Sequence, residues 1–431
     1  MSRTTRAQQE IRRFLDIGPV QVAELDLDDH VLRPGPGSPP VTPGEVFVLV
    51  RRAGRPIGTL LGQVPPGADP RSVLTERALA LEEGEGHRED GWDRAVAVPP
   101  PRATVVVATR ERADRLARAL DSLLAQDHPR FEIVVVDNAP VTGGTRELVE
   151  RKYAERVRYL CEPVPGLAVA HNAGLAAVRS EVVAFTDDDV VADPRWLTEL
   201  TAPFAADPAL GCATGLILPA RLGTPAQVLL ESHGGFAKGF APRTYDPEDP
   251  PADEPLFPFT AGRFGSGANM AFRTEVLRAV GGFDPATGAG TAARGGDDLY
   301  GFVRVLAQGH RLRYTPWALV WHHHRETWRD LEAQAYGYGA GLTAYLTAIL
   351  VNRPALLPAF LARLPRGLAR ARALTAVREA AGGGTPGAHD ARAHPWPGRL
   401  SRLQRRGMLH GPLGYLRARR AVRAATVRRP G

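Results

Sequence analysis

Apolar runs and polar stretches alternate regularly between residues 103 and 220. Nearly continuous apolar runs predict strands, at 104–109, 131–136, 157–160, 182–186 and 211–218. The stretches between them carry apolar residues at helical spacing and predict helices, at 114–125, 145–155 and 167–178. Strands that are apolar on both faces and alternate with helices are typical of a mostly parallel sheet covered by helices. We therefore predict an α/β fold for this region.

The pattern changes on both sides of this region. Residues 46–51 and 57–64 are rich in β-forming residues and predict a hairpin in a small β-rich N-terminal unit, residues 1–100. The α/β domain is expected over 101–330, with one half at 103–220 and a less regular half at 221–330 in which 311–314 is predicted to be a strand. A helical extension (331–381) is expected next, then a linker and a helical basic tail (382–431).

Charge is distributed unevenly over the 431 residues. The net charge is +7, but residues 361–431 carry +14, so residues 1–360 carry −7. The N-terminus lacks the apolar core of a secretory signal, and the two cysteines lack the spacing of a zinc site or a disulfide framework. We therefore expect a cytoplasmic protein whose basic character belongs to its tail.

Acidic residues follow the strand predicted at 182–186. Asp187, Asp188 and Asp189 are adjacent, and carboxylates this close repel one another unless a cation is shared between them. A divalent metal held together with substrate phosphates fits this charge. The alternative is a solvated acidic loop that caps the following helix.

Other polar residues end neighbouring strands. Thr109 ends the first predicted strand, Arg110 and Glu111 follow it, and Asp137 closes the second. Ligands of parallel sheets bind beyond the carboxyl ends of the strands, where a carboxylate can accept a hydrogen bond from a ribose or a base. The alternative for Asp137 is a turn residue.

Asp297 and Asp298 follow two glycines and precede a predicted helix, so they are either a general base or a helix cap. His322 begins a run of three histidines that cannot all point into one site, so it is either a metal ligand or part of a surface cluster. His171 and Asn172 lie in a predicted helix and face either a diphosphate or solvent.

Several enzyme classes are excluded by missing motifs. The sequence has no Walker A loop, no G-x-G-x-x-G after the early strands, no H-E-x-x-H and no G-x-S-x-G. These absences argue against P-loop chemistry, a dinucleotide oxidoreductase, a common zinc protease and a serine hydrolase.

The order of the remaining motifs resembles family 2 inverting nucleotide-sugar glycosyltransferases. The segments that carry the resemblance are 105–112, 120–126, 134–138, 172–175, 185–189, 267–273, 281–284 and 296–299, followed by the late histidine. The resemblance covers residues 103–325. It implies a GT-A fold, a nucleoside diphosphate sugar as donor, and Mg²⁺ or Mn²⁺ as cofactor.

The resemblance also implies roles for single residues. They are nucleotide contacts at Thr109, Arg110, Glu111, Asp137, Asn172, Asp187 and Asp188, and metal ligands at Asp187, Asp189 and His322. Asp298 matches the base, with Asp297 as the other candidate because the family usually has Glu there. His171 stands where related sequences often carry Arg.

No Gln-x-x-Arg-Trp motif of processive synthases follows the acidic pair, which favours a single addition. The acceptor class stays open between a polysaccharide, a lipid-linked molecule and a small molecule. A non-catalytic nucleotide-sugar-binding scaffold and a nucleotidyltransferase are the alternative functions. The basic tail suits peripheral contact with an anionic membrane or a disordered solubilising role, and no nucleic acid partner is expected.

Overall fold

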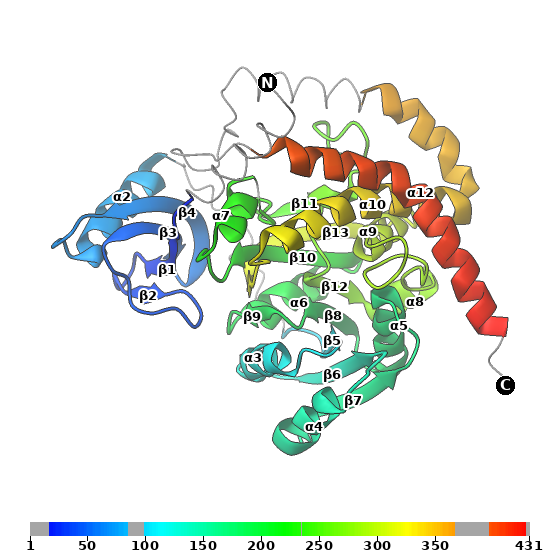
Figure 1. Ribbon diagram of the computed structural model, residues 1–431, viewed down its shortest axis with the longest axis horizontal. Helices are drawn as coiled ribbons and strands as arrows, with labels where there is room; N and C mark the ends of the chain where they lie inside the picture. The colour runs from blue at the N-terminus through cyan, green and yellow to red at the C-terminus, as the bar shows by residue number, and fades with distance from the viewer. Residues whose placement is uncertain (1–16, 85–98, 234, 367–395, 428–431) are drawn as a thin grey trace.

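The computed structural model describes residues 17–84, 99–233, 235–366 and 396–427. Two sheets organise these residues (Figure 1). The parts of the predicted N-terminal unit at 1–16 and 85–98, and the linker at 382–395, lie outside the described residues.

The first sheet has four strands in the order β2-β1-β3-β4 and is covered by one helix. Its elements are β1 (Gln21–Asp26), β2 (Leu32–Pro34), β3 (Gly44–Arg52), β4 (Arg55–Val64) and α2 (Pro70–Gly84). β3 and β4 pair antiparallel, which confirms the predicted hairpin.

Both faces of β3 are buried, because neighbouring side chains point to opposite sides of a strand. Val48 and Val50 pack toward α2, whereas Phe47 and Leu49 pack against residues of the larger sheet such as Trp321. Arg51 adds an ion pair to Asp193 at 2.6 Å. One face of the small sheet is therefore docked on the main domain.

The second sheet has the order β11-β13-β10-β12-β8-β5-β6-β7, and β9 pairs with β13. Its strands are β5 (Ala103–Thr109), β6 (Phe131–Asn138), β7 (Val157–Glu162), β8 (Val182–Asp187), β9 (Val190–Ala192), β10 (Leu210–Pro219), β11 (Arg243–Tyr245), β12 (Asn269–Arg273) and β13 (Arg311–His322).

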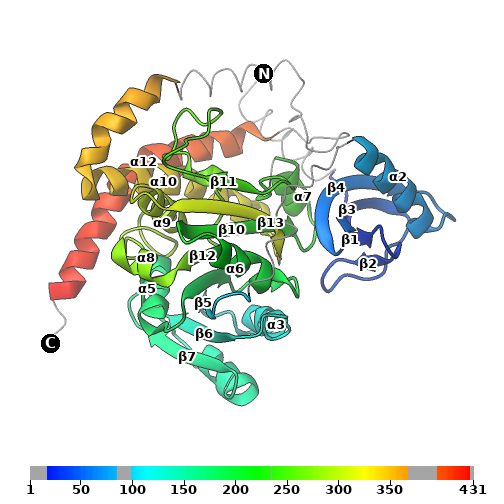
Figure 2. The same ribbon diagram turned by 180° about the vertical axis from the view of Figure 1, so that it is seen from behind.

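Helices pack on both faces of this sheet, as Figures 1 and 2 show from opposite sides. They are α3 (Ala113–Leu124), α4 (Gly144–Leu148), η2 (Val149–Tyr153), α5 (Leu167–Ala177), α6 (Trp196–Ala206), α7 (Pro225–Ser232), η3 (Ala261–Arg263), α8 (Thr274–Ala279) and α9 (Asp297–Leu306). The predicted α/β class and its helical cover are confirmed.

The sheet is mixed, which differs from the mostly parallel expectation. β7, β6, β5 and β8 are parallel, but β12 pairs antiparallel with both β8 and β10. The chain between β10 and β12 contains α7, β11 and η3 rather than a single crossover helix, so β12 is not part of a parallel strand–helix–strand unit. The predicted domain boundaries stay predictions.

β13 is longer than the strand predicted at 311–314. Pro316 lies where the pairing with β10 shifts register between Thr315 and Leu319, so its missing N–H breaks no ladder bond there. The irregularity lets the strand continue to His322. The strand predicted from the sequence ends before Pro316 because a proline is normally absent from the interior of a central strand.

The C-terminal elements are α10 (Trp328–Asn352), η4 (Pro354–Leu356), helical residues 357–366 and α12 (Gly398–Val427). Among the described residues, no single helix is both long enough and apolar enough to cross a membrane. α10 and Pro354–Arg366, bent by 109°, satisfy both criteria only as a pair. α12 packs closely on α10, where a Cβ added at Gly407 would lie 2.1 Å from the Tyr336 carbonyl oxygen.

We predict that Gly407→Ala destabilises the protein by about 1–3 kcal/mol, because backbone atoms of α10 cannot move aside as a side chain would. The clash more than offsets the better helix propensity of alanine, about 1 kcal/mol. Thermal unfolding followed by calorimetry measures the effect. Gly262→Ala is the control, since no atom lies within 4 Å of its added Cβ. Equal unfolding temperatures for the two variants would contradict this packing.

Candidate active site

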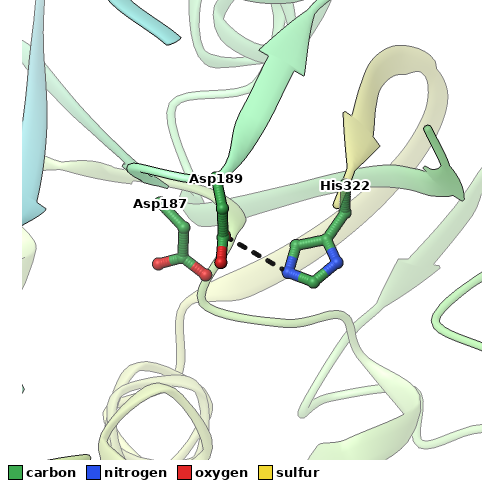
Figure 3. Close-up of side chains that lie close together, drawn as sticks. All are labelled: Asp187, Asp189 and His322. Atoms are coloured by element: carbon green, nitrogen blue, oxygen red, sulfur yellow. Dashed lines mark ion pairs between the residues drawn. The ribbon is translucent and has the colours of Figure 1, made fainter. Parts of the chain in front are cut away.

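Asp187, Asp189 and His322 form a cluster at the end of β8 (Figure 3). One ligand atom from each lies within 4.8 Å of the others. β9 carries the chain directly from Asp189 to an antiparallel pairing with β13 in which Val190 faces His322. This pairing brings the aspartate run at 187–189 next to the histidine run that begins at His322, although the two are far apart in the sequence.

The two carboxylates of this cluster have different electrostatic environments. Burial acts to raise the pKa of Asp189, but the hydrogen bond and charge of His322 and the nearby Arg325 and Arg112 hold it below its usual range. Burial and the charge of Asp189 raise the pKa of Asp187 to about 7. Among the described residues, no ion pair joins Asp187 to a cationic side chain.

Two carboxylates and an imidazole are a donor set suited to Mn²⁺ or Mg²⁺. Burial and the charge of Asp189 disfavour the ionised form of Asp187 and raise its pKa, so additional positive charge is needed to keep this carboxylate ionised. A divalent cation would supply that charge. The residues present therefore fit the metal implied by the resemblance.

Asp188 has a different environment from its neighbours. Its carboxylate accepts a hydrogen bond from the Thr109 hydroxyl at 2.7 Å and one from Arg112 at 3.1 Å. Thr109 ends β5, which pairs with β8, so this contact ties the two strand ends together. The structure thus places Asp188 and Thr109 against each other.

His322 is held by a chain of polar contacts that the sequence analysis missed. Its Nδ1 lies 3.0 Å from Nδ1 of His324, and Nε2 of His324 lies 3.1 Å from the Glu231 carboxylate. His324 is buried behind the cluster. Partners of this kind fix the orientation and tautomer of a ligand histidine. Glu231 lies on α7, and no sequence signal connects it to the histidines.

A cleft of about 390 Å³ opens beside the cluster. Thr109, Asn138 and Gly290 line it together with Asp187, Asp189 and His322. Arg110, Arg112 and Arg325 also line it and place positive charge beside the carboxylates. The sequence analysis named Arg110 but not Arg325, although Arg325 directly follows the histidine run.

The remaining predicted nucleotide contacts lie at the ends of β5 and β6. Asp137 accepts a hydrogen bond from the Tyr159 hydroxyl at 2.9 Å, while its other oxygen is buried without a hydrogen-bond partner among the described residues. Burial raises the pKa of Asp137. Glu111 accepts hydrogen bonds from the N–H groups of Val141 and Thr142, and so holds the loop after β6.

Asn172 and His171 face inward from α5. The Asn172 amide both donates to and accepts from the backbone of Phe283, so its hydrogen-bonding groups are already occupied. His171 is 1% exposed and packs between Phe185 and Phe283, with its Nδ1 3.3 Å from the Asp297 carboxylate. The solvent-facing alternative for His171 is therefore wrong.

Asp297 and Asp298 begin α9 but have different surroundings. Gly296 has a φ of +87°, a left-handed conformation that glycine adopts readily, and a Cβ there would lie 2.5 Å from the Gly341 carbonyl oxygen of α10. Asp297 is buried toward His171. Asp298 is half-buried and accepts hydrogen bonds from the N–H groups of Gly267 at 2.9 Å and Leu299 at 2.8 Å.

Asp298 is suited to accept a proton near neutral pH. Burial and the charge of Asp297 raise its pKa to about 6, against the opposing effect of the two N–H donors. Gly267, which donates to Asp298, precedes Ala268, whose carbonyl accepts from the Thr186 hydroxyl at the end of β8. One short loop thus connects the candidate base to the carboxylate cluster.

Comparison with known proteins identifies the part of the chain that carries the carboxylate cluster. Residues 104–281 match the model of glycosyl transferase family 2. The pre-mycofactocin glycosyltransferase of Mycobacterium tuberculosis is 29% identical over 256 residues, covering 57% of this chain and 49% of the relative. The O-antigen biosynthesis protein RfbC of Myxococcus xanthus is 28% identical over 251 residues, covering 57% of this chain and 19% of that protein.

The chain spans about half the length of the mycobacterial relatives it matches. Among solved structures, the mannosyltransferase PcManGT from Pyrobaculum calidifontis, in complex with GDP-Man and Mn²⁺, is similar with a TM-score of 0.47 and 23% identity. The similarity covers 75% of this chain and 92% of that chain. The family match supports the predicted glycosyltransferase class for residues 104–281, and the observed sheet and its helices confirm the α/β fold.

We predict that His324→Phe weakens Mn²⁺ binding by about 10–100-fold, because it keeps a buried ring but removes the nitrogen that orients His322. Isothermal titration calorimetry with Mn²⁺ alone measures the change. His323→Phe is the matched control, since its ring makes neither of the contacts that link His322 to Glu231. If both variants bind Mn²⁺ as wild type does, the polar chain behind His322 has no role in holding metal.

Proposed function

Residues 104–281 belong to glycosyl transferase family 2, and from this premise we propose that the protein transfers a sugar from a nucleoside diphosphate sugar to an acceptor hydroxyl. The transfer inverts the anomeric carbon, depends on a divalent metal and adds a single sugar. The observation that carries the proposal is the loop 267–268, which joins the half-buried base Asp298 to the strand that ends in the carboxylate cluster.

Donor binding follows from the charges around the cleft. Asp187, Asp189 and His322 would hold Mg²⁺ or Mn²⁺, which when bound supplies positive charge that stabilises the departing nucleoside diphosphate. Arg110, Arg112 and Arg325 line the same cleft and orient the diphosphate oxygens. Asp137 offers its unpartnered oxygen to the nucleoside.

Transfer requires a base on the acceptor side. An Asp298 oxygen takes the proton of the acceptor hydroxyl while the acceptor oxygen bonds to the anomeric carbon. The bond from the anomeric carbon to the diphosphate oxygen breaks at the opposite face, so the configuration inverts and the electron pair leaves with the nucleoside diphosphate. Asp297 faces His171 and helps to keep the pKa of Asp298 raised.

The acceptor is a polysaccharide, a lipid-linked molecule or a small molecule. We also propose a cytoplasmic location, with peripheral contact at the inner face of the membrane. No nucleic acid partner is proposed, because residues 1–360 carry a net charge of −7, which repels a phosphate backbone.

We predict that Asp298→Asn lowers kcat by about 10²–10⁴-fold, because the amide cannot accept the acceptor proton. In wild type, kcat falls as the pH drops below about 6, where Asp298 becomes protonated. Steady-state rates between pH 5 and 8 test both statements. Asp121→Asn, at an exposed carboxylate paired with Lys152, is the control. Full activity of Asp298→Asn would remove this residue as the base.

Donor identity is tested by calorimetry with UDP, GDP, dTDP, ADP and NAD, with and without Mn²⁺. We predict that one nucleoside diphosphate binds, that this binding needs Mn²⁺, and that Asp189→Ala loses the binding because a metal ligand is removed. Binding of NAD without metal would contradict the proposal. Metal-dependent nucleotide binding with no transfer to any acceptor class would instead indicate a scaffold.

A further inference from the structure

Exposed leucines gather on the C-terminal helices. Leu409, Leu413 and Leu416 of α12 are 83%, 49% and 41% exposed, although most large apolar side chains among the described residues are buried. Their spacing of four and then three residues places them on one side of the helix. Leu357 and Leu361, in the helical residues 357–366, are exposed as well. Water-exposed leucines at helical spacing indicate a surface that contacts something else.

Exposed arginines lie on the same side of α12, both before and after the leucines. They are Arg402, Arg405 and Arg406 before the leucines, and Arg420 and Arg423 after them. With about 100° between successive helical residues, these five arginines and the three leucines form one face, here called the Arg–Leu stripe. α12 contains no Asp or Glu, and neither do residues 350–366.

The opposite side of α12 holds the helix on the protein. Cβ atoms added at Gly407 and Gly411 would lie 2.1 and 2.3 Å from carbonyl oxygens of α10, and Tyr415 is fully buried. α12 runs along the outside of the molecule in both views (Figures 1 and 2). The Arg–Leu stripe therefore faces away from the body of the protein.

We infer that the Arg–Leu stripe binds the protein peripherally to an anionic membrane surface. Leucines between basic residues can enter the boundary of headgroups and acyl chains while the guanidinium groups pair with lipid phosphates. The net charge of −7 on residues 1–360 repels the same surface, so the basic helices face it. The inference does not depend on the proposed transfer reaction.

Vesicle flotation with the full chain tests this inference. The probes are vesicles of phosphatidylcholine alone and vesicles with phosphatidylglycerol added in equal parts. One variant carries Arg402→Gln, Arg405→Gln and Arg406→Gln, and a second carries Leu409→Gln, Leu413→Gln and Leu416→Gln. The control carries Arg71→Gln, Arg77→Gln and Leu79→Gln on α2, where the same residue types are exposed.

Wild type and control are expected to float with the anionic vesicles and to be released by salt. The arginine variant should lose about a hundredfold in partitioning, since each basic residue adds to attraction by the surface. The leucine variant should lose about tenfold or more. Circular dichroism and the unfolding temperature should match wild type for both variants, because the substituted side chains are exposed.

Two results would overturn the inference. In the first, wild type fails to float with the anionic vesicles, or floats equally well with phosphatidylcholine alone. In the second, light scattering shows wild type as an oligomer that the leucine variant dissociates, while vesicle binding is unchanged. The stripe would then be a contact between copies of the chain.

Discussion

Three consecutive carboxylates at the end of β8 impose the constraint on which the rest of the site depends. Like charges this close cannot all be buried and ionised unless each has its own partner. Asp188 is bound by Thr109 and Arg112, and Asp189 lies beside His322 and several arginines. Burial and the charge of Asp189 raise the pKa of Asp187, and no arginine or lysine among the described residues forms an ion pair with it. The fold thereby leaves one carboxylate available for a ligand cation.

Meeting this constraint requires contacts between distant elements. β9 is short, yet its pairing with β13 sets His322 opposite Val190, and the irregular pairing around Pro316 lets β13 reach that far. His324 and Glu231 then hold the ring from behind. The loop at 267–268 connects Asp298 to β8 through hydrogen bonds to both. The geometry of the cluster is therefore a property of the whole sheet.

The C-terminal helices support the same site from outside. Gly341 of α10 packs against Gly296, where α9 and its two aspartates begin, and α12 packs on α10 through glycines. Such close backbone contacts resist sliding, because no flexible side chain lies between them. α12, which carries the Arg–Leu stripe, therefore packs on α10, and α10 packs on the start of α9, where the candidate base Asp298 lies.

The sequence by itself determined the α/β class, the strand ends that carry polar residues and the order of the motifs, because apolar periodicity and local residue chemistry are written along the chain. It also indicated Asp187, Asp189, His322 and Asp298 as candidates. Only the tertiary structure decided the antiparallel insertion of β12, the separate surroundings of Asp187 and Asp188, and the inward position of His171. It also brought Glu231 and Arg325 to the site. Those features depend on strand register and on contacts between residues distant in sequence, which no local pattern encodes.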